Sequence, residues 1–177
     1  MKVLVIDDDV ANQQSAHALL SEHDLTVVGT SWEAAEMIGK NEYDVVLTDL
    51  FMSATPDPKE KVNRRVFGSF GAATSDSGDS AEHPLGFGFA LWALTRGVKY
   101  VAVVTDTDHH SNAISAQIDW FHDSYGDSEP NRLEFSGGRL AILHACASDE
   151  DMIRREVLGK RGITGKDWEL ALERLLR

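Results

Sequence analysis

The sequence predicts an α/β protein built around one parallel sheet. Five short apolar runs lack the alternation of a half-exposed strand, which is typical of strands buried on both faces of such a sheet. They cover residues 2–6, 25–28, 45–48, 100–104 and 140–143. Segments with helical character separate the five runs, and this alternation indicates βαβ units with right-handed crossovers. A length of 177 residues suits one substantial core and is short for two.

The first helix is expected over residues 10–22. Asp9 suits its N-cap because a carboxylate can accept hydrogen bonds from the free backbone N–H groups of the first turn. The apolar periodicity of this segment is weak. We expect its few apolar side chains to face the sheet, namely Ala11, Ala18 and Leu19.

The later helices are predicted from apolar spacing and from residues that favour helix ends. One is expected from a cap at Ser31 to Lys40, and another around residues 87–94, ended by Gly97. Residues 126–138 are expected to form a loop. The remaining helices are expected around residues 114–121, 148–159 and 164–176.

The middle of the chain departs from this rhythm. Residues 53–84 are rich in Ser, Gly, Asp and Pro and have no sustained period. Loops of this length are unusual in a compact domain and are often lids or binding elements. A solvated surface insertion without a catalytic role is an equally good interpretation.

Composition excludes several classes of function. The formal net charge of −12 opposes binding to nucleic-acid phosphates, which needs Lys and Arg side chains to replace counterions. A single cysteine, Cys146, excludes an intrachain disulfide and a zinc site built on cysteines. We expect no signal peptide, because the first apolar run is far too short, and no membrane span, because no stretch approaches ~18 consecutive apolar residues. We therefore expect a soluble cytoplasmic protein without a direct nucleic-acid or membrane partner.

Polar side chains gather where the predicted strands end. Asp7 and Asp8 follow the first strand, and Asp49 follows the third. Because the carboxyl ends of parallel strands meet at one edge of a sheet, these carboxylates are expected to lie close together. Carboxylate oxygens are the ligands that hard divalent cations prefer. The sequence therefore predicts a cation site suited to phosphoryl chemistry.

A second polar cluster follows the fourth strand. It holds two acids and two histidines within five residues: Asp106, Asp108, His109 and His110. Such side chains could bind an additional metal ion, and His144 at the end of the next strand supports that interpretation. A polar loop that caps the following helix is the simpler interpretation and the one we favour.

Three motifs resemble those of response-regulator receiver domains, the phosphoacceptor modules of two-component signalling. They are KVLVIDDD at residues 2–9, YDVVLTDLFM at residues 43–52 and YVAVVTDT at residues 100–107. The resemblance implies a flavodoxin-like doubly wound sheet with strand order 2-1-3-4-5. It implies a receiver-like domain over residues 1–158, with an insertion at about 53–84, and a C-terminal helical extension over residues 159–177.

The resemblance also implies roles for single residues. Asp49 would accept a phosphoryl group and Thr105 would be the switch hydroxyl. Mg²⁺, or another divalent cation, would be held by Asp8, Asp49 and the backbone carbonyl of Phe51, with Asp7 acting through water.

Two positions depart from the family's pattern. The family carries a lysine at the end of its fifth strand that pairs with the acyl phosphate, whereas this segment offers His144. A histidine could supply that positive charge only while it is protonated. In addition, Asp106 follows Thr105 where the family usually has a small residue.

Three functional hypotheses follow. The first is a stand-alone receiver, phosphorylated on Asp49 by a histidine kinase or a phosphotransfer protein, that signals to an output protein by protein–protein contact. The second is a degenerate receiver that acts as an unphosphorylated interaction scaffold. The third is a metal-dependent phosphohydrolase-like enzyme. The helix that carries Trp168 could also mediate a homodimer, or pack back on the domain.

Overall fold

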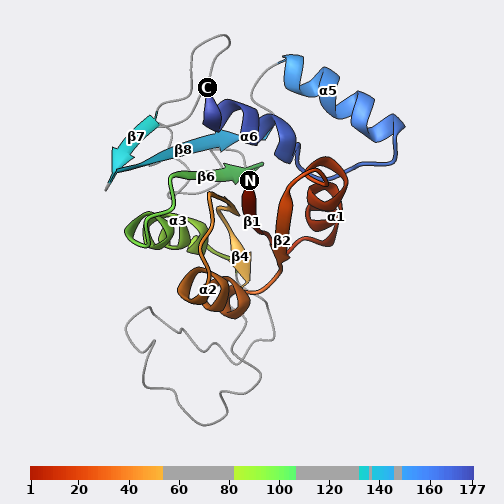
Figure 1. Ribbon diagram of the computed structural model, residues 1–177. Helices are drawn as coiled ribbons and strands as arrows, with labels where there is room; N and C mark the ends of the chain where they lie inside the picture. The colour runs from red at the N-terminus through yellow and green to blue at the C-terminus, as the bar shows by residue number, and fades with distance from the viewer. Residues whose placement is uncertain (54–81, 107–131, 136, 146–148) are drawn as a thin grey trace.

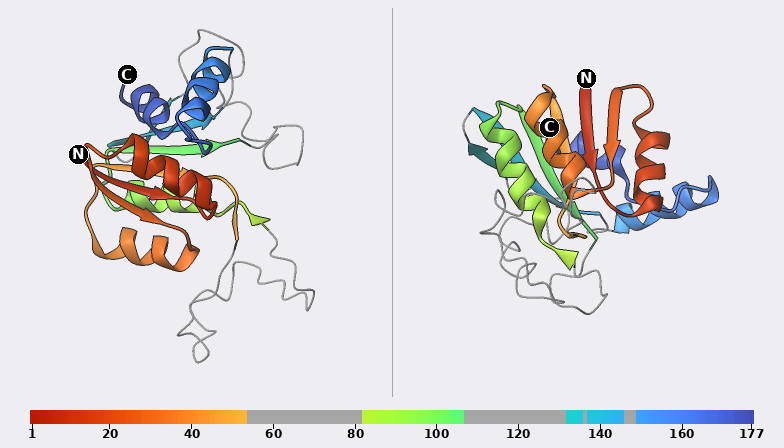
Figure 2. Two further views of the ribbon diagram at one scale, coloured as in Figure 1. Left: turned by 90° about the vertical axis from the view of Figure 1, so that its right-hand side faces the viewer. Right: turned by 90° about the horizontal axis from the view of Figure 1, so that it is seen from below.

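The computed structural model describes residues 1–53, 82–106, 132–135, 137–145 and 149–177 (Figure 1). Within these ranges a central sheet carries helices on both of its faces, as the views of Figure 2 show. Helices α2 (Ser31–Lys40) and α3 (Leu85–Thr95) cover one face. Helices α1 (Val10–Leu19) and α6 (Trp168–Leu176) cover the other. The α/β prediction is confirmed.

The main sheet has the order β2-β1-β3-β6-β8-β7, so its first five strands follow the predicted 2-1-3-4-5 arrangement. These five strands are parallel. Most residues of β1, β3, β6 and β8 are buried, whereas the outer strand β2 is only partly buried. Their bounds are β2 Asp24–Val28, β1 Lys2–Ile6, β3 Val45–Asp49, β6 Tyr100–Thr105 and β8 Gly138–His144. The predicted flavodoxin-like fold is therefore confirmed.

One edge strand was not predicted. Strand β7 (Arg132–Phe135) pairs antiparallel with β8, although residues 126–138 were expected to form a loop. The turn between β7 and β8 contains Gly137, whose φ of +80° favours glycine. Leu133 and Phe135 alternate with charged residues along this edge, and four residues are too few for a clear alternating pattern.

The predicted insertion starts and ends in a short ribbon beside the sheet. Strand β4 (Met52–Ser53) pairs antiparallel with β5 (Glu82–His83), so the two ends of the segment lie side by side. Residues 54–81 lie outside the described residues, as does the helix expected around residues 114–121.

The buried face of α1 differs from the prediction. Ala11 and Leu19 are only half-buried and Ala18 is exposed, whereas Asn12, Ser15 and Ala16 are buried. The prediction was wrong because it assumed that apolar side chains alone face the sheet. Here polar side chains are buried because they hydrogen-bond to other buried groups.

Helix ends mostly follow the predictions. Asp9 caps α1 through its carboxylate, which accepts hydrogen bonds from two backbone N–H groups of the first turn. The cap of α2 is Thr30 rather than Ser31, because the Thr30 hydroxyl accepts the hydrogen bond from the N–H of Glu33. None of the helices in the described ranges is long and apolar enough to cross a membrane.

The end of the chain contributes to the core. Helix α5 (Asp149–Lys160) lies on the outside of α6, away from the sheet (Figure 1). Helix α6 packs on the sheet through the face that was predicted from apolar spacing: Trp168, Ala171, Leu172 and Leu175 are all buried. Trp168 thus packs back on the domain. The boundary between residues 158 and 159 stays a prediction.

Candidate acidic site and its lysine

Three carboxylates meet at the carboxyl ends of β1 and β3. Parallel pairing sets Ile6 beside Thr48, so Asp7 and Asp49 emerge next to each other. One oxygen each of Asp7, Asp8 and Asp49 lies within 4.8 Å of the others. Asp7 is fully buried, whereas Asp8 and Asp49 are partly accessible. The structure therefore brings together the acids that the sequence predicted as a cluster.

A lysine from the far end of the chain completes this cluster. The ammonium of Lys166 lies 2.8 Å from Asp7 Oδ2 and 2.6 Å from Asp49 Oδ1. Its side chain is only 2 % exposed, which makes this a buried ion pair with two acids. Lys166 immediately precedes Asp167, the residue that caps α6, so the packing of α6 delivers the ammonium to the site.

Burial and charge set the protonation of these groups. Burial raises the pKa of Asp49 to about 7, against the opposing attraction of Lys166 and with a further contribution from the charge of Asp7. Burial also raises the pKa of Asp7 above its usual value, although Lys166 opposes it. For Lys166, burial lowers the pKa, but the two carboxylates outweigh it and hold the pKa above its usual value. The ammonium therefore stays charged at neutral pH.

Backbone groups hold the carboxylates in place. The N–H of Leu50 donates to Asp49 Oδ1 at 2.7 Å, and the N–H of Asp9 donates to Asp7 Oδ1 at 2.9 Å. The N–H of Ser53, in the ribbon at the start of the insertion, donates to Asp8 Oδ2 at 2.9 Å. Each acid thus has a fixed orientation and keeps further lone pairs.

The donor set fits a hard divalent cation. Three carboxylates clustered within one ion's reach, two of them partly accessible, supply the oxygen ligands that Mg²⁺ takes while it keeps several waters. One lysine cannot neutralise three carboxylates, so a cation would also relieve repulsion among them. The residues present therefore fit the group that the sequence suggested.

The other predicted site residues are placed as follows. Thr105 is buried at the end of β6, and His144 is paired with it in register at the end of β8, half-buried. Asp106 is exposed, and Phe51 is half-buried between β3 and β4. The remaining members of the second polar cluster, Asp108, His109 and His110, lie outside the described residues.

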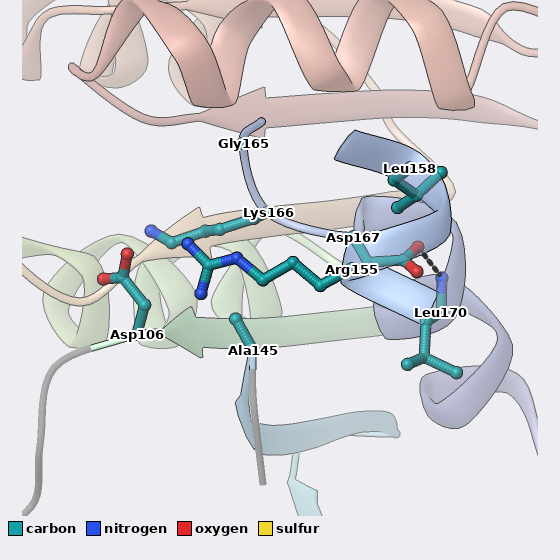
Figure 3. Close-up of a pocket in the computed structure, with 8 residues that line it drawn as sticks. All are labelled: Asp106, Ala145, Arg155, Leu158, Gly165, Lys166, Asp167 and Leu170. Carbon is teal, nitrogen blue, oxygen red and sulfur yellow. Dashed lines mark hydrogen bonds between the residues drawn. The ribbon is translucent and has the colours of Figure 1, made fainter. Parts of the chain in front are cut away.

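A pocket adjoins the acidic site on the side of α5 and α6 (Figure 3). The side chains of Arg155 and Lys166 both extend through it toward the side where Asp106 lies. Asp106 therefore lines the same pocket as two basic residues, Arg155 and Lys166. The lining residues are Asp106, Ala145, Arg155, Leu158, Gly165, Lys166, Asp167 and Leu170.

Lys166 is a residue of the candidate site that was not predicted from the sequence. A lysine was expected next to His144 at the end of β8, whereas α5 separates that strand end from Lys166 in the chain. The sequence does contain a feature that relates Lys166 to the sheet. Lys166 directly precedes the N-cap of an amphipathic helix whose first residue, Trp168, is apolar, so packing of this helix on the sheet brings Lys166 to an edge of the sheet.

Comparisons with known proteins give a limited result. No family model matches the chain, and no curated protein matches it. Among solved structures, the chain is similar to the crystal structure of a response regulator receiver domain protein from Clostridium thermocellum. The two are 18 % identical, the match covers 90 % of this chain and 95 % of that one, and the TM-score is 0.42.

Proposed function

We propose that this protein is an atypical receiver that accepts a phosphoryl group on Asp49 in a reaction that depends on Mg²⁺ or another divalent cation. The observation that carries the proposal is the position of Lys166, whose ammonium contacts both Asp7 and Asp49. A nucleophilic carboxylate beside a charged lysine, in a cluster that fits a hard cation, is suited to phosphoryl transfer.

In the proposed reaction an oxygen of Asp49 attacks the phosphorus of a phosphohistidine. The bond from phosphorus to the imidazole nitrogen breaks, its electron pair stays on the imidazole, and Asp49 becomes an acyl phosphate. Both described contacts of the Asp49 carboxylate fall on Oδ1, from Leu50 and Lys166, so we assign the attack to Oδ2. A bound divalent cation would neutralise charge on the phosphoryl group.

The chain's own residues would supply the remaining interactions. The ammonium of Lys166 can shift from the carboxylate to a phosphoryl oxygen without a change of protonation, because its pKa lies above the usual value. Thr105 ends the strand beside Asp49 and would donate its hydroxyl to the same group. We keep His144, which stands where the family has its lysine and pairs in register with Thr105, as a proposed residue of the site.

The partners follow from the same proposal. The phosphoryl donor would be a histidine kinase or a phosphotransfer protein, and the output would be contact with another protein or with a second copy of this chain. The alternative of an unphosphorylated scaffold rested on the lack of a lysine at the site. The contact of Lys166 with Asp49 weakens that argument. The phosphohydrolase alternative gains no support from the described residues.

Intact-mass measurement tests the proposal directly. The protein is incubated with Mg²⁺ and phosphoramidate or acetyl phosphate, and we expect one phosphate adduct that disappears with EDTA. Asp49→Asn should abolish the adduct, whereas Asp44→Asn, at an exposed acid, should keep it. Failure of the wild-type protein to form an adduct although Mg²⁺ binds would sink the proposal in favour of a scaffold. Multiple turnover of phosphate esters would favour the phosphohydrolase.

A further inference from the structure

Helix α1 buries two polar side chains where an apolar face was expected. Asn12 is 8 % exposed and Ser15 is 2 % exposed, and both face the segment that leads into α6. Burying an amide or a hydroxyl is unfavourable unless hydrogen bonds replace its contacts with water. The partners of these two side chains therefore indicate why they are present.

The Asn12 amide joins the acidic site to the backbone of Lys166. Its Nδ2 donates to both oxygens of Asp7, at 3.1 and 3.0 Å. Its Oδ1 accepts a hydrogen bond from the backbone N–H of Lys166 at 2.9 Å. One side chain thus orients a carboxylate of the proposed cation site and, at its other end, the residue that carries the ammonium.

Further contacts press the same segment onto α1. The Ser15 hydroxyl donates to the backbone oxygen of Lys166 at 2.9 Å, and the indole N–H of Trp168 donates to the backbone oxygen of Asn12 at 2.9 Å. A Cβ at Gly165 would lie 2.4 Å from the backbone oxygen of Ala11, so only glycine permits this approach. These contacts fix the segment, but Asn12 alone among them also contacts Asp7.

We propose that Asn12 is a positioning residue that couples Asp7 to Lys166 and, through Lys166, to α6. This inference rests on the proposed phosphoryl transfer to Asp49 and adds a route by which the site and the C-terminal helix sense each other. Asn12 does not touch the reacting atoms. It fixes the distance between the Asp7 carboxylate and the Lys166 backbone, so that the Lys166 ammonium reaches Asp49.

Ser15 provides the matched control. Asn12→Ala removes the contacts with Asp7 and with the Lys166 N–H. Ser15→Ala removes hydrogen bonds to two backbone oxygens, those of Asn12 and Lys166, and leaves the contacts with Asp7 in place. If Asn12 merely packed the segment, the two variants would behave alike. We expect the rate of phosphate uptake to fall by about tenfold or more in Asn12→Ala, as for other residues that orient ligands, and less in Ser15→Ala.

A double-mutant cycle tests whether Asn12 acts through Lys166. In a Lys166→Met background, Asn12→Ala should lower the rate of phosphate uptake little further, because the group that it positions is gone. Equal losses in the presence and absence of Lys166 would overturn the proposal. Asn12→Asp serves if Asn12→Ala does not fold, because it keeps the acceptor for the Lys166 N–H and exchanges the donor facing Asp7 for a carboxylate.

A second readout does not depend on phosphoryl transfer. In NMR spectra, Mg²⁺ added to the wild-type protein should shift the signals of the Lys166 amide and the Trp168 indole N–H. These shifts should be lost in Asn12→Ala and kept in Ser15→Ala. Persistence of the shifts in Asn12→Ala would overturn the coupling. If the wild-type protein takes up no phosphate but shows the shifts, the proposed function fails while the coupling stands.

Discussion

The two faces of the sheet are built on different principles. Beneath α2 and α3 the buried cluster includes Ile38, Leu94 and Ile142, and no charged side chain among the described residues is buried there. Beneath α1 and α6 an apolar cluster of similar kind continues into a buried polar seam, which we define as Asp7, Asn12, Ser15 and Lys166. The seam ends at the acidic site, and it contains both charged side chains that are buried among the described residues, Asp7 and Lys166.

This difference separates stability from function. Apolar burial stabilises a fold without strict geometry, whereas a buried ion pair gains little over apolar residues of similar size. A polar seam is therefore poorly explained as a device for stability. Its hydrogen bonds instead hold Lys166 in the position where its ammonium contacts Asp49. We expect changes within the apolar cluster to alter stability alone. Changes in the seam, or in residues that press on the strand carrying Asp49, should alter chemistry as well.

The largest expected effect on stability comes from the apolar face. Ile38→Ala should lower the free energy of unfolding by about 2–5 kcal/mol, because it removes buried methyl groups and leaves a cavity. Chemical denaturation measures this loss. At a temperature where the variant stays folded, its rate of phosphate uptake should match that of the wild-type protein.

Leu172→Ala supplies the matching change on the other face. Leu172 is buried in α6, so its truncation should cost a similar free energy and also slow phosphate uptake by loosening the helix that follows Lys166. Equal rates of phosphate uptake in Ile38→Ala and Leu172→Ala would contradict the proposal that only the face under α1 and α6 affects the chemistry.

The next effect concerns the contact between α3 and the strand that carries Asp49. A Cβ at Gly86 would lie 1.6 Å from the backbone oxygen of Asp49, so Gly86→Ala must displace α3 or β3. We expect a loss of about 1–3 kcal/mol of stability, as for other overpacked sites, together with slower phosphate uptake. Denaturation curves and intact-mass kinetics measure the two effects.

Gly88 is the control for this substitution. It lies in the same helix, and a Cβ there would meet nothing within 4 Å. Gly88→Ala should stabilise the protein by up to about 1 kcal/mol, because alanine has the higher helix propensity. Destabilisation by both substitutions would show that the close approach at Gly86 is not the cause.

A smaller effect is expected from pH. Because the pKa of Asp49 is raised to about 7, protons compete with a divalent cation for this carboxylate below neutrality. The affinity for Mg²⁺ should rise about tenfold between pH 6 and pH 8 and then level off. Calorimetric titration across this range measures it, and a flat profile would contradict the raised pKa.

Stability of the metal-free protein should show the opposite trend. The folded state keeps the Asp49 proton up to about pH 7, whereas the unfolded chain releases it near 3.8. The free energy of unfolding should therefore fall as pH rises between these values. Asp7 contributes in the same direction, since its pKa is raised as well.

Much of this architecture could be predicted from the sequence. The strands were recognisable because parallel strands buried on both faces appear as unbroken apolar runs. The meeting of Asp7 with Asp49 followed from topology, since both residues end parallel strands. Neither prediction required knowledge of contacts between distant side chains.

The polar seam could not be predicted by the same reasoning. Apolar spacing placed Ala18 on the buried face of α1, whereas Asn12 and Ser15 are buried there. A polar side chain is buried only when its partners are present, and these partners belong to the segment around Lys166. A local pattern cannot reveal a hydrogen bond between residues so far apart in the chain.

The measurement that tests the account most directly is the rate of phosphate uptake by Lys166→Met. Lys160→Met is its control, because Lys160 is exposed and pairs only with Glu156 among the described residues. Both variants are incubated with Mg²⁺ and phosphoramidate and followed by intact mass. We predict a fall of about 100-fold for Lys166→Met, as for other lost electrostatic contacts to a transition state, and no change for Lys160→Met. Equal rates in both folded variants would contradict the assignment of Lys166 to the site.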